Sequence, residues 1–84
     1  MDTPEIRAQL LSLLTGVAPD IEPDRVDPAQ PLRDQFDFDS MDALHFATAV
    51  SQAFGIEIAE TDYPELASIE SAGNFVAARL AHEP

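Results

Sequence analysis

Residues 39–55, DSMDALHFATAVSQAFG, carry a clear helical pattern with a start and a stop signal, and the rest of the fold is built around them. At about 100° per residue, five apolar side chains of this stretch fall within one arc, as in a helix that packs on a core. They are Ala43, Phe46, Ala47, Val50 and Phe54. Asp39 suits the N-cap position, and Gly55 suits a residue that ends a helix. The stretch predicts an amphipathic helix from Ser40 to about Phe54.

Three other side chains of this helix form a second, smaller stripe beside Ser40. Met41, Leu44 and Thr48 fall about 100–160° away from the first arc. A four-helix core cannot easily cover both stripes, so we expect Met41 and Leu44 to stay partly exposed.

Helical patterns also precede and follow this stretch. We expect Thr3 to be the N-cap of the first helix, with Pro4 in its first position, and Gly16 to mark its end. The last helix is predicted to start at Ser68. Each of these helices has one apolar stripe. The stripes are Ile6, Leu10, Leu13, Leu14 and Val17 in the first helix, and Ile69, Ala72, Gly73, Val76 and Leu80 in the last.

The segment between the first two helices is a long connection. Residues 18–39 contain prolines at positions 19, 23, 28 and 31, so no helix of useful length can run through them. A connection of this length inside a compact domain is usually functional or held by its own side chains. We expect an ordered loop that can include a short helical turn, pinned by Val26, Leu32 and Phe36.

The remaining segment precedes the last helix. Residues 56–58 are predicted as an extended connector, because no second β pattern is available to pair with them. Residues 63–67 are predicted as at most a short helix, opened by Thr61 or Asp62. The fold class is therefore all-α: one domain over residues 1–84, a small irregular four-helix bundle with three longer helices, a short third helix and a long first loop.

The composition excludes several functions. Sixteen acidic residues oppose four arginines and no lysine, which gives a formal net charge of −12 and disfavours binding to nucleic acids or anionic membranes. The chain has no cysteine, which excludes disulfides, thiolate zinc sites and cysteine nucleophiles. No apolar run is long enough for membrane insertion and no signal peptide is visible, so we expect a cytoplasmic protein. We also expect a monomer.

Two motifs give the chain a resemblance to a known family. Residues 39–41, Asp-Ser-Met, resemble the Asp-Ser-Leu-type motif that opens the second helix of acyl carrier proteins, the phosphopantetheine-bearing carriers of fatty acid, polyketide and related syntheses. Residues 54–58, Phe-Gly-Ile-Glu-Ile, resemble the Phe-x-x-Glu-Ile ending of that helix. The resemblance runs essentially from end to end, and it implies a specialised, free-standing acyl carrier protein.

The resemblance implies a role for Ser40. The serine of the family's motif carries a 4′-phosphopantetheine arm, which a phosphopantetheinyl transferase takes from coenzyme A. The thiol of the arm then carries acyl groups as thioesters between acyl-loading and acyl-processing enzymes, so the chain is a carrier and not an enzyme. A serine at a helix start is exposed, and the helix N-terminus favours a phosphodiester. Asp39 and Asp42 flank the motif and oppose that charge, so we expect them to cap the helix or to be recognised by a cationic transferase.

The resemblance also implies a surface for partner enzymes. Met41 and Leu44 match the family's exposed apolar recognition positions beside the serine. Phe38 stands where the family commonly has a small residue, so we expect it either to plug the core or to join the contact surface around the arm.

The distribution of charge departs from the family. Its members usually place several glutamates along the second helix, whereas residues 43–56 contain no acid and have His45 as their only titratable group. The acids lie in the connections on either side of this helix. They are Asp20, Glu22, Asp24, Asp27, Asp34 and Asp37 before it, and Glu57, Glu60, Asp62 and Glu65 after it. A solvated face and the steering of basic partners both explain these acids. The neutral helix indicates a specialised carrier with dedicated partners.

Other functions compete with that of an acyl carrier. An aminoacyl or peptidyl carrier could use the same fold, and an acidic helical interaction module without a prosthetic group would explain the charge and the apolar stripe equally well. A hydrolase triad of Ser40, Asp42 and His45 is rejected, because Ser40 and His45 lie about 140° apart around the helix. Calcium loops that start at Asp37 or Asp20 are rejected because they lack the required glycine, and no metal site is predicted.

Overall fold

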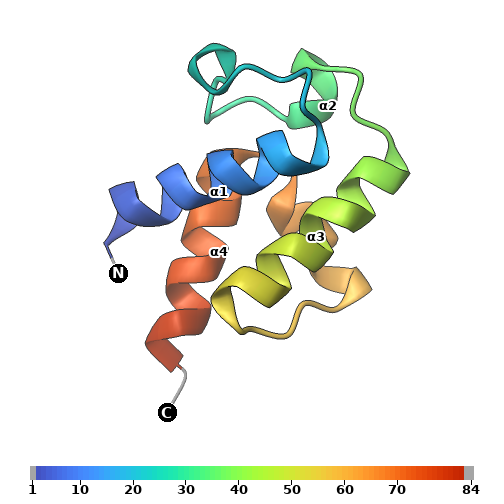
Figure 1. Cartoon of the computed structure of the whole chain (residues 1–84). Coiled ribbons are helices and arrows are strands. Elements are labelled where there is room, and N and C mark those ends of the chain that lie inside the picture. The colour runs from blue at the N-terminus through green and yellow to red at the C-terminus, as the bar shows by residue number, and fades with distance from the viewer. Residues whose placement is uncertain (1, 83–84) are drawn as a thin grey trace.

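The computed structural model describes residues 2–82, whose regular secondary structure is entirely helical (Figure 1). Its elements are α1 (Thr3–Val17), η1 (Pro23–Arg25), α2 (Leu32–Gln35), α3 (Ser40–Phe54), η2 (Glu60–Leu66) and α4 (Ile69–His82), where η denotes a 3₁₀ helix. The segment with η1 and α2 covers one end of the bundle that α1, α3 and α4 form (Figure 1). The predicted all-α fold, with three longer helices, a short one before the last and a long first connection, is confirmed.

One apolar core joins the long helices. α1 packs against both α3 and α4, and η2 packs against the same two helices. The buried side chains are Ile6, Leu10, Leu14, Ile21, Leu32, Phe46, Ala47, Val50, Ile56, Leu66, Ile69, Ala72 and Val76. The three predicted stripes supply most of this set, because burial follows the helical period. Their outer members, such as Leu13, Phe54 and Leu80, are half-buried at its edge.

The ends of α1 differ from the prediction. Asp2, and not Thr3, is the N-cap, and its side chain accepts a hydrogen bond from the Glu5 N–H (3.0 Å). Both residue types can cap a helix, and Pro4 is tolerated in either register because the first turn has no intrahelical N–H partners. The prediction that Gly16 ends the helix is also wrong, since α1 continues to Val17.

The long first connection is ordered, as predicted, and it contains two short helical segments, η1 and α2. Leu32 is buried, and Val26 and Phe36 pack against the core as half-buried side chains. Gln35 braces the loop, because its amide nitrogen donates to two backbone carbonyls at 2.9 Å and its amide oxygen accepts from the Asp27 N–H at 2.7 Å. The predicted pins are therefore confirmed, and they are supplemented by side-chain hydrogen bonds.

The segment before α4 is longer and better fastened than predicted. η2 begins at Glu60 rather than at Thr61 or Asp62, and the Asp62 carboxylate accepts from the Ala59 N–H (3.0 Å). Arg79 of α4 holds the segment by an ion pair with Asp62 (3.2 Å) and a hydrogen bond to a carbonyl of the preceding connector (2.8 Å). Residues 56–59 have no regular structure, so the predicted extended connector is confirmed.

Gly55 ends α3 in the left-handed conformation, with φ at 65°, as its position predicts. Gly55→Ala should lower the free energy of unfolding by about 1–2 kcal/mol, because a Cβ is disfavoured at this φ. No atom lies within 4 Å of the added Cβ, so crowding does not contribute. Urea denaturation followed by circular dichroism measures the change.

Gly16→Ala is the matched control. Its added Cβ also meets no atom within 4 Å, but its φ is not positive, so the substitution should stabilise α1 by about 0.5–1 kcal/mol. Equal effects of the two substitutions would contradict the assignment of strain to Gly55.

Candidate functional site

Two aspartates fix the start of α3 at Ser40. Asp39 Oδ1 accepts a hydrogen bond from the Asp42 N–H (2.9 Å), and Asp42 Oδ2 accepts one from the Asp39 N–H (3.2 Å). This reciprocal pair is a capping box, in which two side chains satisfy backbone donors at the helix start. Asp39 is therefore the N-cap that the sequence indicates, and the Ser40 hydroxyl is not needed for capping.

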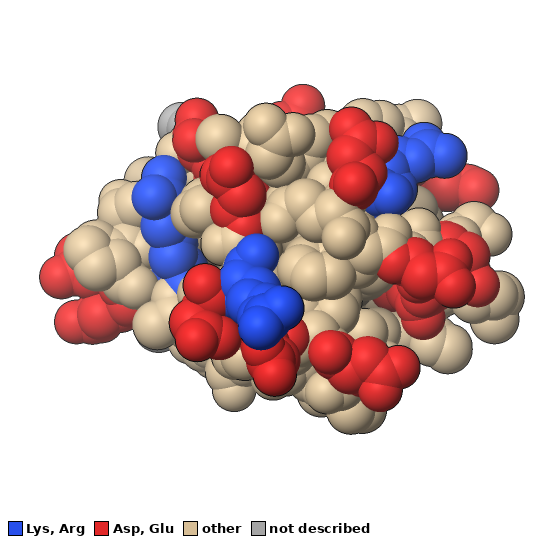
Figure 2. Space-filling model, turned by 90° about the horizontal axis from the view of Figure 1, so that it is seen from above, with Lys and Arg blue, Asp and Glu red and all other residues tan. Residues whose placement is uncertain are grey.

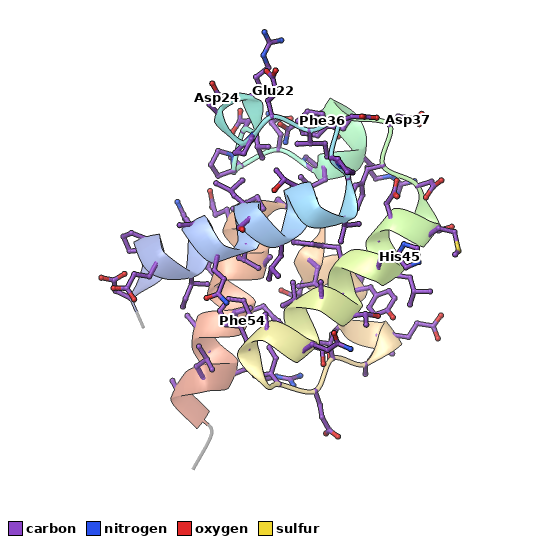
Figure 3. The ribbon with its side chains drawn as sticks, in the orientation of Figure 1. Glu22, Asp24, Phe36, Asp37, His45 and Phe54 are labelled. Atoms are coloured by element: carbon purple, nitrogen blue, oxygen red, sulfur yellow. The ribbon has the colours of Figure 1, made fainter. Side chains whose placement is uncertain are left out.

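Ser40 is exposed at this end of the helix. The helix dipole favours an anionic group on its Oγ, whereas the carboxylates of Asp39 and Asp42 oppose one. Asp42 is engaged in the capping box, and His45 is exposed further along α3 (Figure 3). The structure thus presents an exposed hydroxyl at a helix start whose neighbouring carboxylates are occupied in the cap.

A pocket of about 450 Å³ lies beside Ser40. Ser40 and Asp39 line it together with aromatic side chains of three segments: Phe38 before α3, Phe46 on α3 and Tyr63 on η2. Tyr63 also lines a second, smaller pocket of about 200 Å³ along α3. The site thus combines an exposed hydroxyl with a mostly apolar recess next to it.

Phe38 contributes to both the core and the pocket. Its ring meets the buried Phe46 ring edge to face, with centroids 6.4 Å apart and planes at 81°. The side chain is half-buried and lines the pocket next to Ser40. Its bulk therefore shapes the approach to Ser40, where the resemblance leads one to expect a small residue.

Met41 and Leu44 lie outside this pocket. Their exposed fractions are 56% and 41%, and among residues 2–81 they are the large apolar side chains that are exposed to solvent. The prediction that they stay partly exposed is confirmed, because the core arc of α3 faces α1 and η2 and leaves their stripe uncovered.

Sequence reasoning did not assign Arg33 to the site, nor the residues before α4 that line the pocket, which are Tyr63, Pro64, Leu66 and Ala67. Arg33 lies on α2 and Tyr63 on η2, so both reach the site only through the tertiary packing of irregular segments. No periodic pattern marks either residue. Tyr63 is the first residue of the short helix predicted over residues 63–67, but no role at the site was assigned to it.

Acidic side chains cover much of the connecting segments. Figure 2 shows them spread over the face seen from above, with arginines between them. Glu22, Asp24 and Asp37 lie on the connection that caps the bundle, away from the far end of α3 at Phe54 (Figure 3). Within residues 2–82, no helix combines the length and the apolar character that a membrane crossing requires.

The sequence around this site matches a family model described as "Phosphopantetheine attachment site", over residues 8–76. The matched range includes Ser40, the capping box and the pocket. The chain belongs to the phosphopantetheine-attachment family. Its members hold 4′-phosphopantetheine covalently, so the resemblance and the cofactor inferred from the motif are confirmed.

A curated relative supports the same family. The chain is 26% identical over 77 residues to "Acyl carrier protein 2, mitochondrial" of Arabidopsis thaliana. The match covers 92% of this chain and 60% of the relative, so this phosphopantetheine-attachment domain spans about three-fifths of the relative's length.

The capping box can be tested through stability. Asp39→Ala should lower the free energy of unfolding by about 1 kcal/mol, because it removes the acceptor for the Asp42 N–H. Asp39→Asn keeps an acceptor, so its free energy of unfolding should stay within a few tenths of a kcal/mol of the wild-type value. Urea denaturation of both variants is the measurement. Equal losses would show that the charge of Asp39, and not its cap, is what matters.

Proposed function

We propose that Ser40 is the residue to which 4′-phosphopantetheine is attached. The observation that supports this most is the exposed Ser40 hydroxyl at the start of α3, inside the matched family range and free of a capping role. The hydroxyls of three other serines are already engaged in hydrogen bonds. Ser51 donates to a backbone carbonyl (2.6 Å), and the Ser68 and Ser71 hydroxyls share a hydrogen bond (3.0 Å) at the start of α4. Ser12 is also exposed but lies in the middle of α1.

The reaction needs a second enzyme and coenzyme A. Ser40 Oγ attacks the β-phosphorus of coenzyme A, a new P–O bond forms, and the pyrophosphate P–O bond breaks to release 3′,5′-ADP. A base of the phosphopantetheinyl transferase accepts the proton of the hydroxyl. The attached arm supplies a thiol that forms thioesters with acyl groups. This chain contributes the exposed hydroxyl and the pocket beside it.

The proposed function is that of an acyl carrier, not an enzyme. It receives acyl groups from loading enzymes and presents them to processing enzymes of a fatty acid, polyketide or related pathway. An aminoacyl or peptidyl cargo is the second candidate, since the same arm carries it. The family match disfavours an interaction module without a prosthetic group. We place the carrier in the cytoplasm as a monomer, while the curated relative is described as mitochondrial.

The partner surface is proposed to centre on Met41 and Leu44. Both are exposed beside Ser40, and the helix that holds them has no acid between residues 43 and 54. Apolar side chains removed from water at the centre of an interface usually contribute most of the affinity. A partner of this carrier is therefore expected to offer an apolar recess to α3 instead of a mainly basic surface.

Intact-protein mass spectrometry tests the attachment. The chain is incubated with coenzyme A, magnesium and a broad-specificity phosphopantetheinyl transferase, beside Ser40→Ala and Ser12→Ala. The wild type and Ser12→Ala should each gain one phosphopantetheinyl group, and Ser40→Ala should gain none. Modification of Ser40→Ala, or loss of modification in Ser12→Ala alone, would place the arm elsewhere.

The proposed partner surface predicts that removing its side chains weakens the interaction with the transferase without lowering the free energy of unfolding. Replacing both Met41 and Leu44 by Ala should lower kcat/KM for modification by the transferase about tenfold, which corresponds to about 1.4 kcal/mol. The free energy of unfolding should change by less than about 0.5 kcal/mol, because both side chains are exposed.

Leu13→Ala is the contrasting control, since Leu13 is half-buried against the core on α1. It should cost about 1–2 kcal/mol of stability and leave the modification of the folded protein unchanged. A double variant that unfolds easily but is modified at the normal rate would refute the proposed surface.

A further inference from the structure

Arg33 is the cationic residue of the pocket beside Ser40. The chain has four arginines and no lysine, so positive charge is scarce. Arg25 and Arg79 are in ion pairs at 2.8 and 3.2 Å, respectively. Arg7 packs against α4, where its Cγ lies 3.5 Å from the position that a Cβ would take at Gly73. Among the described residues, Arg33 is thus the arginine that faces the site without an ion pair.

Modification of Ser40 would place a new anion among existing ones. A phosphodiester on Oγ lies next to the carboxylates of Asp39 and Asp42, whose capping hydrogen bonds hold them at the same helix start. The whole chain has a formal net charge of −12, so the surroundings add to the repulsion. Like charges at short range raise the free energy unless a cation is close.

We propose that the Arg33 guanidinium pairs with the phosphodiester formed at Ser40 and holds the base of the arm at the mouth of the pocket. This inference rests on the proposed attachment at Ser40. A guanidinium offers a rigid fork of N–H donors that matches the oxygens of a phosphate group. Arg33 is exposed on α2, so its side chain can turn toward the anion without giving up a buried partner.

The walls of the pocket strengthen this pairing. Phe38 and Tyr63 line the same recess as Arg33 and Ser40. Aromatic side chains exclude water from one side of the ion pair, and an ion pair with less water around it is stronger. With its base held by Arg33, the arm would be directed along the pocket rather than into solvent, which makes Arg33 a positioning residue for the arm.

Nuclear magnetic resonance of the unmodified and the modified protein tests the pairing. Modification of the wild type, Arg33→Gln and Arg25→Gln is first driven to completion and verified by intact mass. The readouts are the exchange of each arginine Nε–H with water and the ³¹P resonance of the phosphodiester. Arg25→Gln is the matched control, because Arg25 is also exposed but pairs with Glu22.

The expected result is slower exchange of the Arg33 Nε–H on modification, by up to about fivefold, which is the upper range for an exposed ion pair. The exchange rate at Arg25 should not change. The ³¹P resonance should shift in Arg33→Gln and stay at the wild-type position in Arg25→Gln. Salt at 1 M, where the Debye length falls to about 3 Å, should remove most of the effect.

Three outcomes would overturn the proposal. Unchanged exchange at Arg33 in a fully modified protein would refute the pairing and leave the attachment at Ser40 intact. A response of Arg33 to a succinyl thioester, with none to the free arm or to a butanoyl thioester, would assign Arg33 to a carboxylate of the cargo. Failure of the wild type to gain the phosphopantetheinyl group would refute both the attachment and the pairing.

Discussion

The capping box at the start of α3 is the local interaction on which the site depends. Because Asp39 and Asp42 satisfy each other's backbone N–H groups, the helix begins at Ser40 without using its hydroxyl. Had Ser40 been the cap, its Oγ would have been bonded to the backbone and turned into the first turn. The two acids that free the hydroxyl also surround it with negative charge. The same residues would therefore make the proposed modification of Ser40 sterically simple and electrostatically demanding.

The helices and the exposed stripe could be predicted from the sequence, whereas the pocket could not. Phe46, Val50 and their neighbours repeat with the helical period, and Met41 and Leu44 fall outside that arc, so a single helix already separates buried from exposed side chains. Ile21 is also buried, although in the sequence it stands between Asp20 and Glu22 in a proline-rich segment, where no periodic pattern marks it. Arg33 reaches the site from α2 by tertiary packing, which no local pattern encodes.

The acidic side chains and the exposed apolar side chains occupy different parts of the surface around α3. Acids lie on the connections that precede and follow α3, whereas the first half of α3 presents the exposed Met41 and Leu44, and α3 contains no acid after Asp42. At the proposed partner surface, the acids would act on the long-range approach of a partner with some positive charge, and Met41 and Leu44 on the close contact that holds it. The two contributions would then come from different residues and could vary independently.

The ion pair between Asp62 and Arg79 has a mechanical consequence for the recess next to Ser40. Tyr63 follows Asp62 directly on η2, so the ion pair fastens the chain next to this wall of the recess to α4. Both partners are partly open to water, with side-chain exposures of 24% and 38%. An ion pair that is open to water weakens as the ionic strength rises. Added salt therefore loosens one of the contacts between η2 and α4, while the buried Leu66 side chain and the Arg79 hydrogen bond to the Glu57 carbonyl keep the segment in place.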